Sequence, residues 1–504
     1  MGGEFRSPMR YVSTRGNHAP VGAAEAIHLG MVPGGGLFAP EDLPRLDLGA
    51  LRGLGYREIA RRALGALLEG FSEDEIASAA GEAYGPERFD VPSVADLVPL
   101  DDRRYLLELF HGPTGAFKDV ALQILPRILA AAKRKLGVTS HTVILVATSG
   151  DTGKAALEGF RDGEGLSVVV FYPHGGVSEI QRLQMVTTEG SNVHVFGVRG
   201  TFDDCQGGAK RIFADRRLAA RLEREGLALS SANSINWGRL CPQIVYYVWA
   251  YLRLVDLGRL REGERIDVCV PTGNFGNILA AFYARSMGLP IERLVCASNR
   301  NKVLPDFFAT GVYDRNREFH RTISPSMDIL VSSNLERFLF EVAGRDPDRV
   351  RRWYAEFEET GRFAVDGAAK AAMDGVVAAG WADEARTLEA IRAAYRASGR
   401  VLDPHTAVGA AVCEDFGPSD RVTVIAATAS PYKFSRDVLR AIAGEEAPDE
   451  FRSVARLEEL TGLPAHRSVA GLRERPVRHD RLIGAGAMEA CVLEVARARC
   501  GTRS

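Results

Sequence analysis

From about residue 104 to residue 427, short runs of apolar and β-branched residues alternate with stretches of helical pattern. This alternation limits the fold more than any other feature of the chain, because βαβ units align their strands in parallel and cover both faces of the sheet with helices. The sequence therefore predicts an α/β protein built on a mostly parallel, doubly wound sheet. Strands are expected at 105–110, 142–148, 167–172, 192–198, 266–270, 294–297 and 422–427.

The chain has 504 residues, which is enough for about three domains. Residues 9–98 carry short helical patterns and are expected to form an N-terminal domain, residues 99–445 hold the α/β region, and residues 446–504 form a charged C-terminal extension. Within the α/β region, residues 333–415 have an almost entirely helical pattern. Residues 1–8 resemble an expression leader, so Met9 is the expected natural start.

The composition argues against several classes of function. Hydrophobic residues make up 46% and charged residues 25%, and the net charge is −2, so no basic field attracts nucleic acid or a membrane surface. No apolar run reaches the ~18 residues of a membrane-spanning helix, and the N-terminus lacks a signal-peptide pattern. The seven cysteines form no CxxC pair, which favours reduced thiols and a cytoplasmic location over disulfides or a metal site. The oligomeric state, monomer or dimer, stays open.

One lysine stands at an unusual place in this pattern. Lys118 follows the first expected strand and a turn that contains Gly112 and Gly115, and it opens a helix expected to extend to about Gly137. Glycines in the turn let the backbone approach a ligand closely. A lysine held among apolar neighbours loses its proton more readily, and the neutral amine is the nucleophile of Schiff-base chemistry. For Lys118 considered alone, an exposed lysine at a helix start is the alternative.

Three more unusual loops follow expected strands, at the sheet edge where open α/β sheets bind ligands. Residues 148–153 (TSGDTG) open a helix with small polar residues, whose N–H groups suit a carboxylate or phosphate. Residues 271–277 (PTGNFGN) offer the same groups to a phosphate monoester. Thr428 follows the last expected strand, and its hydroxyl can hydrogen-bond a ring nitrogen.

Two rival nucleotide-binding motifs do not match these loops. A P-loop needs glycine where Thr148 stands and Ser or Thr where Ala155 stands, and the fingerprint G-x-G-x-x-G is absent from residues 271–277. A capped helix is the other alternative for TSGDTG, with Asp151 or Thr152 as the N-cap. Together, the four loops offer an amine for an aldehyde, N–H groups for a phosphate and a hydroxyl for a ring nitrogen. Pyridoxal 5′-phosphate carries all three of the matching groups: an aldehyde, a phosphate and a ring nitrogen.

Eight motifs occur in the chain in this order: STRG, LFHGPTGAFKD, ATSGDTG, SANSINWGRL, PTGNFGN, SPSMDILVSSNLERF, DPHTAV and ATASPYKF. They resemble, in collinear order from about Met9 to about residue 445, the longer type of threonine synthase. The resemblance implies a fold-type-II, pyridoxal-phosphate-dependent enzyme, similar to the tryptophan synthase β subunit. Two doubly wound parallel-sheet lobes are then expected, the smaller and mobile one at about 140–230, with an added N-terminal domain. The implied reaction converts O-phospho-L-homoserine and water to L-threonine and phosphate.

The same resemblance implies roles for particular residues. Lys118 would be the Schiff-base lysine and the catalytic base, and Thr428 would face the pyridine nitrogen. The cofactor phosphate would be held by Gly273, Asn274, Phe275, Gly276 and Asn277. The substrate carboxylate would be bound by Ser149, Asp151 and Thr152. Many relatives have asparagine at the position of Asp151, so its carboxylate needs either protonation or a different role.

The candidates for the substrate phosphate are Asn233, Asn236 and Arg239, because the guanidinium group presents a fork of donors that suits phosphate. Lys154 is a further cationic candidate. Helix capping by the two asparagines and solvated charges at Arg239 and Lys154 are the alternatives. A phospholyase that stops at 2-oxobutyrate, a dehydratase acting on free serine or threonine, and a non-catalytic phosphometabolite-binding protein stay open as functions. Intact Lys118 and Thr428 favour an enzyme.

Overall fold

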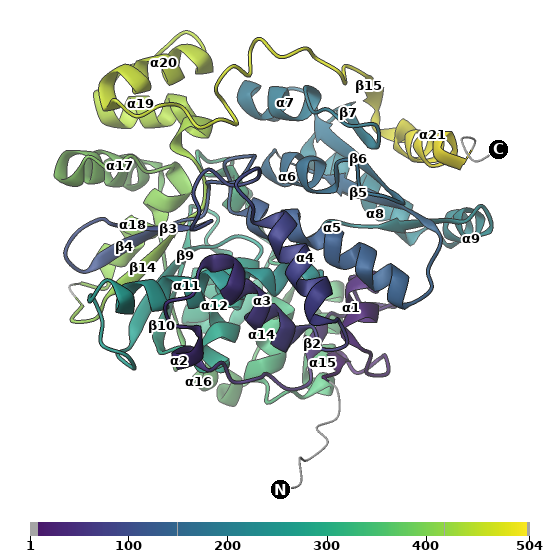
Figure 1. Ribbon diagram of the computed structural model, residues 1–504, viewed down its shortest axis with the longest axis horizontal. Helices are drawn as coiled ribbons and strands as arrows, with labels where there is room; N and C mark the ends of the chain where they lie inside the picture. The colour runs from purple at the N-terminus through teal and green to yellow at the C-terminus, as the bar shows by residue number, and fades with distance from the viewer. Residues whose placement is uncertain (1–8, 149, 418, 501–504) are drawn as a thin grey trace, which may run out of the picture.

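The computed structural model describes residues 9–148, 150–417 and 419–500, except for the side chains of the last two residues. Its larger sheet has six strands in the order β13-β10-β9-β14-β4-β3. Figure 1 labels all of these strands except β13. All neighbouring strands are parallel except the pair β3 and β4. The strands are β3 (Asp96–Pro99), β4 (Arg104–Glu108), β9 (Ile266–Pro271), β10 (Ile291–Ser298), β13 (Val377–Trp381) and β14 (Thr423–Ala427).

The smaller sheet is wholly parallel, in the order β15-β7-β6-β5-β8. Successive side chains of a strand point to opposite faces, and in β5 Ile144 and Val146 join the main hydrophobic core while Val143 and Leu145 join a second cluster. Burial on both faces explains why these strands are continuous apolar runs in the sequence. The strands are β5 (His141–Ala147), β6 (Leu166–Pro173), β7 (Val193–Arg199), β8 (Leu227–Ser230) and β15 (Leu482–Gly484).

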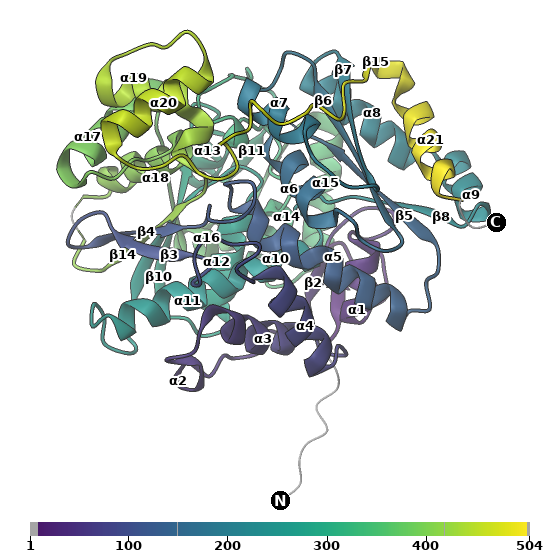
Figure 2. The ribbon, with the colours of Figure 1, turned by 45° about the horizontal axis from the view of Figure 1, so that its top comes forward.

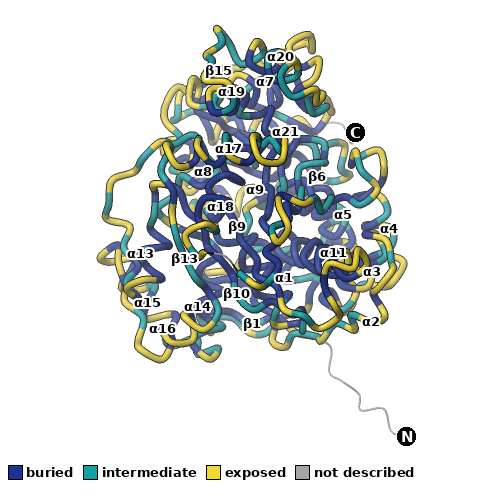
Figure 3. The backbone as a smooth tube through the Cα atoms, turned by 90° about the vertical axis from the view of Figure 1, so that its left-hand side faces the viewer, coloured by how far each residue is buried: buried dark blue, intermediate teal, exposed yellow. Residues whose placement is uncertain are grey.

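Helices cover both faces of the smaller sheet. The face with the main core carries α6 (Asp151–Phe160) and α7 (Glu179–Val186). The opposite face carries α8 (Phe202–Ala214), α9 (Arg216–Arg224) and the C-terminal helix α21 (Met488–Cys500). Figure 3 shows the buried residues gathered in the interior and the exposed residues on the outer turns.

The long helix α5 (Lys118–Lys135) contacts α6, which covers the smaller sheet, and the N-terminal helices α1 and α4. The remaining helices of the described residues have the following bounds. They are α1 (Ala23–Leu29), α2 (Leu48–Leu51), α3 (Tyr56–Leu67), α4 (Glu73–Ala83), α10 (Trp237–Leu240), α11 (Pro242–Asp256), α12 (Gly276–Ser286), α13 (Val303–Thr310), α14 (Leu335–Val342), α15 (Pro347–Thr360), α16 (Gly367–Asp374), α17 (Glu384–Ser398), α18 (Pro404–Asp415), α19 (Ser435–Ala443) and α20 (Glu450–Thr461).

Short elements complete the chain. Two small antiparallel sheets pair β1 (Tyr11–Ser13) with β2 (Phe38–Pro40) and β11 (Val312–Asp314) with β12 (Arg362–Ala364). The 3₁₀ helices are η1 (Pro325–Met327), η2 (Pro431–Phe434) and η3 (Ala485–Ala487).

The C-terminal extension connects the two sheets. Helix α20 packs against α19 and α7, and β15 then joins the edge of the smaller sheet beside β7. In Figure 2 this segment is the yellow chain that crosses from α20 to β15. The extension therefore contributes to both halves of the molecule.

The α/β fold is as the sequence predicts, and the helix expected after Lys118 is α5. The expectation that residues 333–415 are almost entirely helical is wrong, because β12 and β13 lie within them. Strand β13 has the sequence VAAGW and, among the described strands, pairs only with β10 at the sheet edge, so it lacks the long apolar run of the central strands. No helix in the described part of the chain is long and apolar enough to cross a membrane.

Candidate functional site

The four loops singled out in the sequence meet around the amine of Lys118. Strands β4, β14 and β9 are neighbours in the larger sheet, so the loops that follow them leave the same edge. The N–H of Phe117 donates to the Thr428 carbonyl oxygen at 2.9 Å, and Ala116 forms a β-bridge with Ala429. The Lys118 turn and the Thr428 loop are thus bonded directly to each other.

The Lys118 side chain is buried at the start of α5. Its Nζ donates to Ser326 Oγ at 3.3 Å and lies 3.5 Å from Asp151 Oδ2. Burial lowers the pKa of the Lys118 amine, and this effect outweighs the opposing attraction of Asp151; the positive charges of Lys433 and Arg239 lower it further. A larger fraction of this amine is therefore neutral at a given pH than in an exposed lysine.

Asp151 provides a fixed negative charge beside that amine. Its Oδ1 lies 2.9 Å from Lys433 Nζ and accepts a hydrogen bond from Gln181 Nε2 at 3.0 Å. Burial opposes ionisation, but the charges of Lys433 and Lys118 hold the pKa of the Asp151 carboxyl well below its usual range. Of the two alternatives for Asp151, the contacts therefore favour a different role over protonation.

The helix that begins at Asp151 is capped differently from either alternative in the sequence. Gly150 occupies the N-cap position, with φ at +137°, and Asp151 is the first helical residue. A methyl group on Gly150 would lie 2.5 Å from the end of the Gln181 side chain, which would have to move, and the positive φ is one that residues with a side chain rarely adopt. N-capping by Asp151 or Thr152 is thus wrong. Thr152 is half-buried in the first turn, and Ser149 lies outside the described residues.

The loop of residues 271–277 lies against the segment that contacts Lys118. Phe275 has a left-handed backbone, with φ at +63°, and precedes the first turn of α12. A Cβ on Gly273 would stand 2.7 Å from the Ser326 carbonyl oxygen, so only glycine permits this approach. Since Ser326 Oγ also contacts Lys118, the loop and the amine share one neighbour.

Asn277 has one side-chain group in use and one without a partner. Its Oδ1 accepts hydrogen bonds from the hydroxyls of Tyr246, at 2.8 Å, and Tyr247. Its buried Nδ2 has no hydrogen-bond partner among the residues the structure describes. An unpaired buried donor is costly, so at the N-terminus of α12 it marks a place for an acceptor.

Thr428 is also held by a network that the sequence did not suggest. Its N–H donates to Thr406 Oγ1 at 3.2 Å, and the Thr406 hydroxyl donates to Asp403. Asp403 also contacts His405 Nδ1 at 2.8 Å, and His405 Nε2 accepts the N–H of Ser326 at 3.1 Å. The motif DPHTAV therefore ties the Thr428 loop to the segment beside Lys118.

The candidates for an anion differ in their surroundings. Arg239 is buried, and burial lowers the pKa of its guanidinium to about 10. Its Nη1 donates to the Ala232 carbonyl oxygen at 2.5 Å, but within the described ranges its Nε has no hydrogen-bond partner and no carboxylate is paired with it. A buried cation without a counterion is a strong candidate for anion binding.

Asn233, Asn236 and Lys154 are less available. Asn233 is exposed, and its Oδ1 accepts from Ser234 Oγ at 3.2 Å. Asn236 caps α10 through the N–H of Gly238, at 2.8 Å, and donates to the Ile27 carbonyl oxygen at 2.9 Å, as the capping alternative predicted. Lys154 is buried and contacts Glu158 at 2.5 Å and Thr188 Oγ1 at 2.9 Å, so its charge is neither solvated nor unpaired.

The C-terminal extension supplies a wall of the site that the sequence did not reveal. A Cβ on Gly115, in the turn before Lys118, would lie 2.9 Å from Ser468 Oγ and 3.1 Å from His466 Nδ1. Gln184 Nε2 donates to the Ser468 carbonyl oxygen at 3.1 Å. The extension thus covers the Lys118 turn and fixes it to α7.

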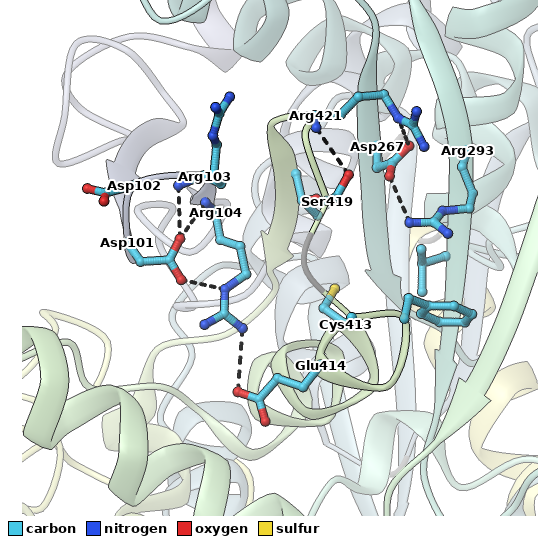
Figure 4. A pocket seen from close by; sticks show the side chains of 14 residues that line it. Asp101, Asp102, Arg103, Arg104, Asp267, Arg293, Cys413, Glu414, Ser419 and Arg421 are labelled. Atoms are coloured by element: carbon cyan, nitrogen blue, oxygen red, sulfur yellow. Dashed lines mark hydrogen bonds and ion pairs between the residues drawn. The ribbon is translucent and has the colours of Figure 1, made fainter.

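A separate cavity of about 440 Å³ lies at the opposite ends of the strands (Figure 4). Its lining includes Arg104 and Thr423, the first residues of β4 and β14. The buried Asp267 is paired there with Arg293 at 2.8 Å and Arg421 at 3.2 Å. Because open α/β sheets bind ligands at the carboxyl ends of strands, this cavity is not the site of the four loops.

Three family models match the chain in sequence. Residues 100–381 match the model described as pyridoxal-phosphate dependent enzyme, residues 10–84 match threonine synthase N terminus, and residues 406–476 match threonine synthase, C-terminal. The threonine synthase of Pseudomonas aeruginosa is 40% identical over 479 residues, which cover 93% of this chain and 95% of that protein. The chain belongs to the threonine synthase family of pyridoxal-phosphate dependent enzymes.

The likeness extends to solved structures. A pyridoxal-phosphate-bound threonine synthase from Brucella melitensis is similar with a TM-score of 0.86 and 36% identity, over 97% of this chain and 100% of that one.

Human threonine synthase-like 1 is 42% identical over 438 residues, which cover 84% of this chain. This chain spans 58% of the length of that relative.

Proposed function

We propose that this member of the threonine synthase family converts O-phospho-L-homoserine and water to L-threonine and phosphate. The observation that carries the proposal is the pair of buried cations at one site: the Lys118 amine, with its lowered pKa, and Arg239, which lacks a carboxylate among the described residues. The first suits proton transfer and the second suits a phosphate ester.

The residues around Lys118 suit pyridoxal 5′-phosphate. We assign the phosphate group to Gly273, Asn274, Phe275, Gly276 and Asn277, a proposal supported by the unpaired Nδ2 of Asn277 at the start of α12. We assign the pyridine nitrogen to the buried Thr428. Lys118 would hold the aldehyde carbon. The cofactor, when bound, supplies an electron sink for charge that develops on the substrate carbons.

The protein's own contribution is to move protons and to hold the substrate. Nζ of Lys118 takes the proton from Cα and then a proton from Cβ, and protons are returned to Cγ and Cα. A lysine on a long stem can reach these several atoms. Phosphate leaves Cγ and water adds at Cβ. Arg239 holds the leaving phosphate, and Asn233 lies in the same motif as a further candidate. Ser149 and Thr152, in the loop that opens α6, are proposed for the substrate carboxylate.

Replacing Gly273 with alanine tests the cofactor cradle. The added methyl group would lie 2.7 Å from the Ser326 carbonyl oxygen, so we expect a loss of about 1–3 kcal/mol of unfolding free energy and a lower content of bound cofactor. Thermal unfolding and absorbance of the purified protein measure both. Gly367→Ala is the matched control, because nothing lies within 4 Å of a Cβ there. Wild-type stability and cofactor content in Gly273→Ala would contradict the assignment.

The experiment that tests the proposed reaction is incubation of the purified holoenzyme with O-phospho-L-homoserine, with threonine, phosphate and 2-oxobutyrate followed together. Threonine and phosphate in equal amounts are the expected result. Phosphate with 2-oxobutyrate and ammonia would instead identify a phospholyase on the same scaffold. Binding of the substrate without phosphate release would identify a non-catalytic protein.

We also propose that the chain has the fold-type-II architecture. It would divide into an N-terminal domain at residues 9–98, a catalytic α/β region at 99–445 and a C-terminal extension at 446–504, with a smaller, mobile lobe at about 140–230. Closure of that lobe would exclude water that could divert the reaction. A cytoplasmic location is supported by the six described cysteines, all of which are free thiols.

A further inference from the structure

A carboxylate lies between two buried lysine amines at the centre of the site. The Lys433 amine is 2.9 Å from Asp151 Oδ1, and the Lys118 amine is 3.5 Å from Asp151 Oδ2. The Lys433 side chain has no exposed surface. Neither its position in the motif ATASPYKF nor its type suggested a role in the sequence.

The two partners of the shorter ion pair come from different halves of the molecule. Asp151 begins α6, which covers the smaller sheet, whereas Lys433 lies in η2, just after the Thr428 loop of the larger sheet. Lys433 Nζ also donates to the Thr114 carbonyl oxygen at 2.9 Å, in the turn that leads into Lys118. Lys433 therefore holds both the carboxylate and the turn that surround Lys118.

The contact between Lys433 and Asp151 affects the protonation of the Lys118 amine. A buried carboxylate with Lys118 as its only cationic partner would hold that amine protonated. Because Asp151 makes its closer contact with Lys433, part of its charge is already compensated, and its attraction for the proton on Lys118 is reduced. Ser326 Oγ lies beside both groups, 3.3 Å from Lys118 Nζ and 3.4 Å from Asp151 Oδ2, so a hydroxyl group also hydrogen-bonds the carboxylate.

We propose that Lys433 is a positioning residue that holds and neutralises Asp151, so that the Lys118 amine can release its proton. The inference rests on the proposed function in one respect, namely that Lys118 is the reactive amine. Other charged or titratable groups face this cluster from each packed element, and they stay unchanged in the test: Asp119, Arg239, His405 and His466.

The test measures the protonation of Lys118 without turnover. The full chain is freed of cofactor with hydroxylamine and labelled with acetic anhydride across a range of pH. The acetylation of the Lys118 peptide is then compared by mass spectrometry with that of the exposed Lys210. In Lys433→Met we expect Lys118 to be labelled about tenfold more slowly at neutral pH, because Asp151 then holds it protonated.

Companion variants separate this effect from a general loss of structure. Lys433→Arg should restore most of the labelling rate, since it keeps the charge. In Asp151→Asn, Lys118 should be labelled faster than in the wild type. Adding Lys433→Met to that variant should slow labelling less than it does in the wild type, because only the direct repulsion between the two amines is then lost. Lys154→Met is the matched control: it also removes a buried lysine paired with a carboxylate, but that pair is with Glu158.

Unchanged labelling of Lys118 in a folded Lys433→Met protein would overturn the proposal. If Lys433→Met does not fold, as judged by circular dichroism, Asp151→Asn decides, and unchanged labelling there would equally overturn it. The readout is acetylation and does not depend on turnover. A protein that makes 2-oxobutyrate, or no product, would therefore contradict the proposed function without changing the labelling of Lys118.

Discussion

Lys118→Ala should lower threonine formation from O-phospho-L-homoserine by at least about 10⁴-fold, since one side chain supplies both the cofactor's anchor and the proton-transfer group. The variant should also lose the visible absorption of the bound cofactor. Phosphate release and absorbance spectra measure the two effects. In the wild type, the rate should fall as the pH is lowered through the pKa of the Lys118 amine, because only the neutral amine accepts a proton.

Lys135→Ala is the matched control for this variant. Lys135 lies in the last turn of the same helix, α5, and forms a salt bridge with Glu75 at 2.7 Å, far along the helix from the four loops. We expect full activity and absorbance from it. A coloured, active Lys118→Ala protein would refute the role of Lys118.

Arg239→Met should reduce kcat/KM for O-phospho-L-homoserine by about 10- to 100-fold, because the substrate phosphate loses a hydrogen bond to a charged group. The unliganded protein should lose less stability than with Arg337→Met, because methionine removes a buried cation that lacks a counterion among the described residues and leaves the Ala232 carbonyl oxygen as the acceptor without its donor. Inorganic phosphate should raise the Tm of the wild type more than that of the variant. Enzyme kinetics and thermal unfolding with and without phosphate measure these effects.

Arg337→Met provides a contrast between a binding and a structural arginine. Arg337 is fully buried, and it donates to the Phe38 carbonyl oxygen at 2.8 Å and to Asn334 Oδ1 at 2.7 Å. Its removal should cost about 1–3 kcal/mol of unfolding free energy through unpaired acceptors, with no specific loss of the phosphate effect on Tm. If Arg239→Met instead lost stability and kept its KM, Arg239 would be structural as well.

The sequence located the candidate site because loops after parallel strands leave one edge of the sheet. Lys118, Gly273 and Thr428 each follow a strand of the larger sheet, and these strands are neighbours. Residues whose roles depend on contacts across the fold were not found. Ser326 and Lys433 stand in two of the motifs, but Ser326 contacts Lys118 across 208 positions, and Lys433 contacts Asp151 from the 3₁₀ helix η2.

Asp151 and Asn236 show why residue type alone did not decide a role. The sequence left Asp151 with two alternatives, and the contacts favour an ionised carboxylate, because the charges of Lys433 and Lys118 lower its pKa. Asn236 has the right chemistry for phosphate, but its donor and acceptor are both engaged by its neighbours. Hydrogen-bond partners are a property of the packed structure.

By itself, the sequence determined the α/β class, the parallel strands, the helix that begins at Lys118 and the family, because these follow from local periodicity, turn chemistry and collinear motifs. Only the tertiary structure decided which charges neutralise one another around Lys118, that β13 completes the edge of one sheet, and that the C-terminal extension covers the Lys118 turn. The physical reason is that burial and electrostatic pairing depend on distances between segments far apart in the chain, and those distances exist only after the chain has folded.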